Sequence, residues 1–142
     1  MVSLKKQIDE ITWQSIDIAV DELCEYYDPT MFDAVFGIAN GGIIPATLVA
    51  NKLKIKYIEI IKKDDEIEDV EDKLDLYESV LIVDDINDSG KTLEPYMHID
   101  TTTRYSCATL YQRHSTKWPN ILCGVELKHD KWLLFPWEVL DK

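Results

Sequence analysis

The chain has 142 residues, 46% of them hydrophobic and 30% charged, which suits the core of one domain and leaves little room for a second. Its formal net charge of −12 argues against a general role in binding DNA or RNA. The sequence contains no run of about 18 apolar residues, the length that a membrane span needs, and no secretory signal at its N-terminus. The cysteines at 24, 107 and 123 are scattered and favour reduced thiols, so we expect a cytoplasmic protein without a membrane partner.

The first elements in chain order are a short strand and an amphipathic helix. Residues 5–11 suggest the strand, and Thr12 is a good N-cap for a helix from about Trp13 to Tyr27. Asp28-Pro29 is expected to end this helix. Its apolar residues recur at the helical spacing of three and four: Ile16, Ala19, Val20, Leu23, Cys24 and Tyr27.

The next segments predict a parallel crossover. The apolar run 34–39 predicts a buried strand, and Asn40-Gly41-Gly42 predicts a turn. A helix is expected from about Ile43 to Leu53, with Pro45 tolerated in its first turn, and a second strand over 55–61. Strand, helix and strand within 30 residues favour a right-handed parallel connection.

The remaining chain completes an open α/β pattern. Residues 62–79 contain nine acids between Asp64 and Glu78 and are interpreted as an exposed mobile loop or irregular excursion, and the alternative is a solvated charged surface, which is what most such runs form. The segment 79–85 is the clearest strand, and a helix is expected to begin near Lys91. Further strands are expected at 105–112 and in the C-terminal runs ILCGVEL and KWLLFPW. We therefore predict an open, mainly parallel twisted sheet flanked by helices, with strand 79–85 central and parallel to strand 34–39.

The most informative segment is the turn that follows strand 79–85. Asp84 and Asp85 lie at the carboxyl end of this strand, which is where open parallel sheets bind ligands. The turn from Asp88 to Thr92 can direct several backbone N–H groups and two hydroxyls at one phosphate, and Gly90 permits close approach of the backbone. A nucleotide-triphosphatase P-loop is disfavoured, because that motif needs a glycine where this chain has Asp85.

The segment VLIVDDINDSGKTL (80–93) resembles the 5-phosphoribosyl-1-pyrophosphate (PRPP) signature of type I phosphoribosyltransferases. This resemblance implies that Asp84 and Asp85 face the ribose hydroxyls and help to place Mg²⁺. It also implies a general acid/base role for Asp88 near N7 of a purine. The residues expected to hold the 5′-phosphate are Asp88, Ser89, Gly90, Lys91 and Thr92.

A second segment, 36–53, resembles the pyrophosphate loop of the same family, which makes Ala39, Asn40 and Gly41 the expected contacts of the leaving group. Purine-salvage relatives usually have Arg or Lys at the position of Asn40, and Asn donates a hydrogen bond without bringing charge. The glycine pair also fits a plain strand-to-helix turn.

The C-terminal segment DKWLLFPWE (130–138) resembles the end of bacterial and archaeal xanthine-guanine and hypoxanthine phosphoribosyltransferases. By this resemblance Trp132 stacks on the base, the main chain of Leu133 reads its edge, and Arg113 takes the place of a Lys that contacts the 6-oxo group. The alternatives are ordinary core packing for Trp132 and Trp137 and an ion-paired surface position for Arg113.

The resemblance extends from ITWQSID to FPWE, although the acidic segment 62–79 lacks the Ser-Tyr pair of the purine relatives. It implies one phosphoribosyltransferase domain over 1–142, with a core over about 12–112 and a small hood from about 113–142 plus the N-terminal segment. The expected function is Mg²⁺-dependent transfer of 5-phosphoribose from PRPP to a 6-oxopurine, by a homodimer or homotetramer that binds no nucleic acid. The alternatives are a binding or regulatory protein on the same fold and a pyrimidine or orotate enzyme.

Overall fold

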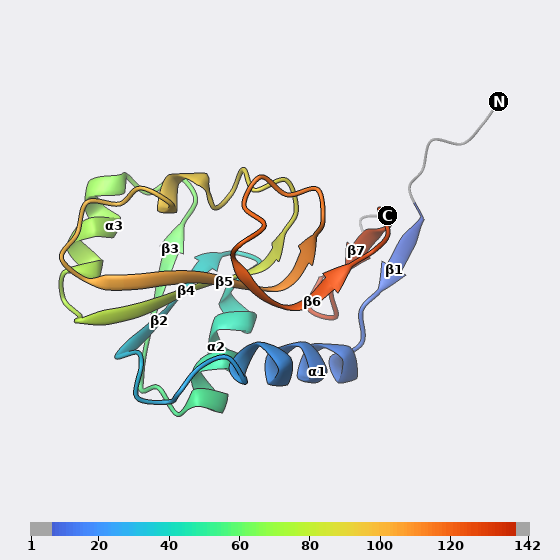
Figure 1. Ribbon diagram of the computed structural model, residues 1–142, viewed down its shortest axis with the longest axis horizontal. Coiled ribbons are helices and arrows are strands. Elements are labelled where there is room, and N and C mark those ends of the chain that lie inside the picture. The colour runs from blue at the N-terminus through green and yellow to red at the C-terminus, as the bar shows by residue number, and fades with distance from the viewer. Residues whose placement is uncertain (1–6, 139–142) are drawn as a thin grey trace.

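The computed structural model describes residues 7–138 and shows a parallel sheet with helices on both faces (Figure 1). None of its helices is long and apolar enough to cross a membrane, within the residues described. The elements in chain order are β1 (Ile8–Glu10), α1 (Trp13–Cys24), β2 (Ala34–Ala39), α2 (Ile43–Leu53), β3 (Tyr57–Lys62), α3 (Ile67–Leu74), β4 (Ser79–Asn87), the 3-10 helix η1 (Glu94–Tyr96), β5 (Arg104–Arg113), β6 (Leu122–Leu127) and β7 (Trp132–Leu134).

The main sheet has five parallel strands in the order β3-β2-β4-β5-β6, so β4 occupies the centre. Ala34 of β2 pairs with Val80 of β4, and the two strands run in the same direction. The predicted fold class and the predicted central position of strand 79–85 are therefore confirmed. Both strands are continuous apolar runs because a parallel strand is covered on both faces.

Alternate residues of these strands face two different apolar cores. Val35, Leu81 and Val83 pack with α1 and α2, whereas Phe36 and Ile82 pack with α3 and η1 on the other face. Figure 1 shows α1 and α2 below the sheet and α3 above it. The period of two in a strand thus distributes the apolar side chains between the two helical layers.

The acidic segment 62–79 contains α3, so its interpretation as a loop was wrong. Val70 and Leu74 of this helix are almost fully buried, and Ile67 packs against them at the same helical spacing. Glu68 and Asp69 lie in the first turn, where negative charge is favourable to the helix dipole. The three apolar residues define one narrow helical face, which the many acids of this segment obscured.

The helix expected near Lys91 is absent from the described structure, and only η1 follows the phosphate-type turn. Pro95 supplies no N–H and disfavours helical backbone at the residue before it, which keeps the turn short. Leu93 and Tyr96 are buried and anchor this turn to the core. The dipole of a following helix therefore contributes nothing here, and the loop amides must bind any anion by themselves.

The N-terminal elements are shorter than predicted. β1 covers three residues of the expected strand 5–11, of which residues 5 and 6 lie outside the described part. Thr12 caps α1 as predicted, since its side chain accepts a hydrogen bond from the Ser15 amide. The helix ends at Cys24 rather than at Tyr27, and Tyr26 and Tyr27 form a tighter turn before Pro29.

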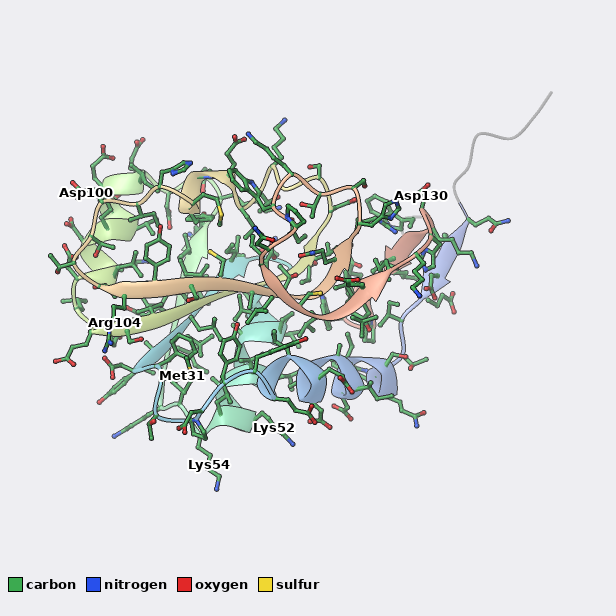
Figure 2. The ribbon with its side chains drawn as sticks, in the orientation of Figure 1. Met31, Lys52, Lys54, Asp100, Arg104 and Asp130 are labelled. Atoms are coloured by element: carbon green, nitrogen blue, oxygen red, sulfur yellow. The ribbon has the colours of Figure 1, made fainter. Side chains whose placement is uncertain are left out.

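A separate two-stranded sheet of β1 and β7, here called the hood, stands at one end of the molecule. β6 was expected in the hood region but belongs to the main sheet, where it pairs with β5. Gly124 of this strand lets α1 pack closely, since a Cβ there would lie 2.2 Å from the Ala19 carbonyl oxygen. Figure 2 places Asp130, on the connection from β6 to β7, at the hood end and Arg104 at the opposite end. The C-terminal ends of β4 and β5 consequently point toward the hood.

Candidate active site

A cavity of about 410 Å³ lies where the C-terminal ends of β4 and β5 meet the hood. Its walls come from the acid pair, the turn after β4, the end of β5 and the segment around β7. The lining residues are Lys63, Asp84 to Leu93, Arg113, Trp132, Leu133, Phe135 and Glu138. The residues predicted to bind ribose, 5′-phosphate and base therefore share one cavity.

Of the paired acids at the end of β4, Asp84 is buried and Asp85 is half-buried. Asp84 is only 4% exposed, and one oxygen of its carboxylate accepts a hydrogen bond from the Asp85 amide at 2.9 Å. Asp85 is held in the same way by the Ile86 amide at 2.7 Å. Burial, followed by the charge of Asp85, raises the pKa of Asp84 from 3.8 to about 8. Burial also raises the pKa of Asp85, so this site favours a cation or a proton beside the pair.

We expect the Asp84→Asn variant to be more stable than the natural chain in the absence of metal and substrate, with a gain that grows as pH rises. The folded-state pKa of Asp84 lies above its unfolded value, so the folded state binds more protons between pH 3.8 and about 8. Its free energy of unfolding must therefore fall as pH rises through that window, and an amide escapes the loss.

Urea unfolding of both proteins at pH 5, 6.5 and 8 measures this difference. The matched control is Asp17→Asn, which removes one exposed carboxylate from α1. A stability gain for Asp84→Asn that stays constant over the three pH values contradicts the assignment.

The predicted pyrophosphate loop does not line the cavity but touches the acid pair. A Cβ added at Gly41 would lie 2.3 Å from Oδ2 of Asp85, so only glycine allows this approach. Gly42 packs equally closely against the Val83 carbonyl. The peptide bond between Ala39 and Asn40 is cis. Close packing therefore requires glycine at positions 41 and 42, which a plain strand-to-helix turn alone would not.

The turn from Asp88 to Thr92 exposes several backbone donors. Lys91 donates its amide N–H to the Ser89 hydroxyl at 3.2 Å, and Gly90 has a φ of +92°. Within the described part of the chain, the amides of Ser89, Gly90 and Thr92 have no protein acceptor. Free amides at such a turn are the groups that bind phosphate oxygens in proteins.

Arg113 joins the acid/base candidate to the hood. It is only 6% exposed, and its Nε donates to Asp88 Oδ1 at 3.1 Å. Its two terminal nitrogens donate to the carbonyls of His129 and Lys131 at 2.7 and 2.6 Å. The expected alternative of a surface arginine is wrong, although the pairing with an acid is present. Arg113 also lines the cavity, where it could reach a bound base. Its contact with the base remains a prediction.

The aromatic residues of the C-terminal segment have different surroundings. Trp132 is 55% exposed and lines the cavity, so it is not a core residue. Leu133 is buried beside it. Trp137 stacks on Phe135 with ring centroids 4.9 Å apart, which is the packing role that was the alternative for this residue. The stacking role of Trp132 remains a prediction.

Six lining residues were not among the predicted site residues: Lys63, Ile86, Asn87, Leu93, Phe135 and Glu138. Lys63 follows β3 and brings a cation near Asp84, whose pKa it lowers slightly. Glu138 accepts a hydrogen bond from the Phe135 amide at 2.9 Å, and its charge raises the pKa of Asp85. For Lys63 a signal existed, because it stands at the end of a strand parallel to β4. Phe135 and Glu138 gave no signal beyond their place in the C-terminal segment.

Comparison with known families decides the class of this site. The model of the phosphoribosyl transferase domain matches residues 6–140. The chain belongs to the phosphoribosyltransferase family. This phosphoribosyltransferase is 31% identical over 121 residues to the xanthine-guanine phosphoribosyltransferase of Cereibacter sphaeroides, a match that covers 75% of this chain and 69% of that protein. The family and the enzyme class expected from the sequence are confirmed.

Solved structures support the same fold. The xanthine-guanine-hypoxanthine phosphoribosyltransferase of Helicobacter pylori superimposes with a TM-score of 0.77 at 20% identity, over 94% of each chain. A purine phosphoribosyltransferase from Pyrococcus horikoshii gives 0.71 at 24% identity, over 95% of this chain and 99% of that one. At these identities the likeness establishes the fold alone.

Proposed function

We propose that this phosphoribosyltransferase moves 5-phosphoribose from PRPP to a 6-oxopurine, in a reaction that depends on Mg²⁺ and releases pyrophosphate. The observation that carries the proposal is the single cavity that contains the acid pair, the free loop amides and Trp132. The name of the Cereibacter relative supports a purine as the base.

Asp84 and Asp85 fit the ribose and a bound Mg²⁺. Mg²⁺ in such sites takes one or two carboxylates and completes its shell with substrate oxygens and water. The described residues offer no cluster of three or more acidic, His or Cys ligands, and two carboxylates are what this mode of binding needs. The raised pKa of Asp84 also fits a place where a cation normally compensates the charge. The ion would neutralise the departing pyrophosphate.

The phosphates are divided between two regions in this proposal. The amides and hydroxyls of the loop from Asp88 to Thr92 bind the 5′-phosphate. Ala39, Asn40 and Gly41 donate to the pyrophosphate on the other side of Asp85, with which Gly41 is in contact. Asn40 brings no charge, and Lys63 compensates by placing an ammonium group at the edge of the cavity.

The base lies on Trp132, with its edge at the main chain of Leu133. A nitrogen of the base attacks C1 of the ribose while the bond from C1 to the pyrophosphate oxygen breaks. Asp88 takes the proton that the base loses, and Arg113 holds its carboxylate in place. Asp84 and Asp85 stabilise the positive charge that develops on the ribose.

The remaining expectations from the sequence are part of this proposal. We infer a cytoplasmic enzyme with one domain over 1–142 and a homodimer or homotetramer as its assembly. β3 is an edge strand with Tyr57, Ile58 and Ile60 exposed by 51, 40 and 43%, and this edge suits contact with a second copy.

Turnover with individual bases tests the proposal. Incubation with PRPP, Mg²⁺ and each of guanine, xanthine, hypoxanthine, adenine and orotate is expected to form nucleotide with the first three, and chelation of Mg²⁺ should stop the reaction. Formation of nucleotide from orotate alone contradicts the base assignment. Tight binding of PRPP without any nucleotide supports the alternative of a binding protein.

A further inference from the structure

Behind the loop from Asp88 to Thr92, on the side away from the cavity, lies a short segment here called the buttress, residues 116–118. None of its three residues lines the cavity, whereas each residue of the loop does. The buttress contacts the loop at Gly90 without reaching the cavity. The segment follows β5 and was not singled out by any sequence motif.

The buttress holds two consecutive carbonyls of the loop. Lys117 donates its amide N–H to the Ser89 carbonyl at 3.0 Å. Trp118 donates its indole N–H to the Gly90 carbonyl at 3.1 Å, and the same carbonyl also accepts the Glu94 amide N–H at 3.1 Å. In a trans peptide the C=O and the following N–H point in opposite directions. The N–H groups of Gly90 and Lys91 therefore point away from the buttress, and of these two the Gly90 amide is free, because that of Lys91 donates to the Ser89 hydroxyl.

Close packing fixes the same orientation. A Cβ added at Gly90 would lie 2.7 Å from Cδ1 of Trp118 and 3.0 Å from Oγ1 of Thr116, so the indole ring and the hydroxyl lie directly against the loop backbone. Lys117 adds an ion pair with Glu94 just after the loop. These contacts lie on the buttress side of the loop backbone.

A buried polar network attaches the buttress to the end of β4. Asn87, which is 1% exposed, donates to the Trp118 carbonyl at 3.0 Å and to Gln112 Oε1 at 2.9 Å. Thr116 donates its hydroxyl to Asn87 Oδ1 at 2.6 Å. Buried polar groups are costly unless each finds a partner, and a satisfied network selects one arrangement. Asn87 directly precedes Asp88, the first residue of the loop. The network therefore fixes the position of the buttress next to the loop.

We propose that Trp118 and Thr116 are positioning residues of the 5′-phosphate site, which hold the loop amides in the orientation that binds phosphate before the substrate arrives. The inference rests on the proposed function, because it takes the loop as the phosphate site. When the donors are already ordered, phosphate binding does not have to spend free energy on ordering them. Without the support, part of the binding free energy is used to order the loop, and the affinity for phosphate falls.

Calorimetric titration with GMP and with guanosine isolates the contribution of the 5′-phosphate. For Trp118→Phe, which keeps an aromatic ring but loses the donor, we expect the ratio of GMP to guanosine affinity to fall roughly tenfold, the value of one lost hydrogen bond. Thr116→Val should give a similar fall, and guanosine affinity should stay the same in both variants. In turnover, the KM for PRPP should rise and the KM for the base should not.

Two matched variants serve as controls. Thr116→Ser keeps the hydroxyl and should keep the natural ratio, and Trp13→Phe makes the same ring change in α1, outside the cavity lining. An unchanged ratio in both Trp118→Phe and Thr116→Val would overturn the inference. If the natural chain itself binds GMP no better than guanosine, or binds neither, the loop is not a phosphate site. That outcome contradicts the proposed function itself, whatever the variants do.

Discussion

Replacement of Asp88 by Asn is expected to lower kcat by about 10²–10⁴-fold, the usual contribution of a general acid/base group, and to leave PRPP affinity nearly unchanged. An amide has the shape of the carboxylate but cannot accept or return a proton at neutral pH. The side-chain oxygen of Asn can still accept the hydrogen bond from Arg113 Nε, which in the natural chain is 3.1 Å long. The proposed phosphate contacts in this loop come from backbone amides and from the hydroxyls of Ser89 and Thr92, which the substitution leaves in place.

Steady-state kinetics and a separate PRPP titration distinguish the two effects. Asp130→Asn makes the same chemical change at the tip of the connection to β7 (Figure 2), and the cavity lining does not include it. This control should keep kcat. A kcat of Asp88→Asn within a factor of a few of the natural chain removes Asp88 from the acid/base role.

The second large effect concerns the choice of base. We expect the natural chain to prefer 6-oxopurines over adenine by at least about 100-fold in kcat/KM. A guanidinium can donate to the 6-oxo group, whereas the 6-amino group of adenine is itself a donor and offers the guanidinium no acceptor. Arg113→Met should lose most of this preference. It should also lower kcat, because Asp88 and the carbonyls of His129 and Lys131 lose their common donor.

Comparison with two other variants separates recognition of the 6-position from general damage. Trp132→Ala should weaken all bases alike, since stacking does not depend on the group at position 6. Arg104→Met changes an exposed arginine at the far end of the molecule and should change neither rate nor preference (Figure 2). Equal use of guanine and adenine by the natural chain refutes the role of Arg113 at the 6-position.

The sequence predicted well those elements whose signal is local. The apolar run before Asp84 identified the central strand, because continuous burial on both faces leaves no polar positions in it. The turn from Asp88 to Thr92 carried enough specific residues to suggest an anion site. α3 was missed because its apolar face has few members among many acids, and the helix after Lys91 was predicted although Pro95 shortens it.

Individual side-chain contacts between distant segments could not be predicted from spacing, although the parallel relation of strands 34–39 and 79–85 was. The sequence shows Arg113 as one cation among many acids, and only the fold brings its guanidinium to Asp88 and to the connection before β7. The buttress is a similar case, since Trp118 lies near Gly90 only because β4 and β5 are neighbours. Local spacing contains no information about such pairings.

The hood has a consequence for the order in which the site forms. β1 and β7 come from near the two ends of the described chain, and the pairing of Ile8 with Trp132 closes a loop that includes the whole main sheet. Contacts of such high sequence separation form late in folding, because their closure entropy must be met first. Three-residue strands are also the kind of element that opens locally without global unfolding. We therefore expect the phosphate half of the cavity to form with the main sheet, and the wall that carries Trp132 to be completed afterwards, when Leu133 and Phe135 join the core.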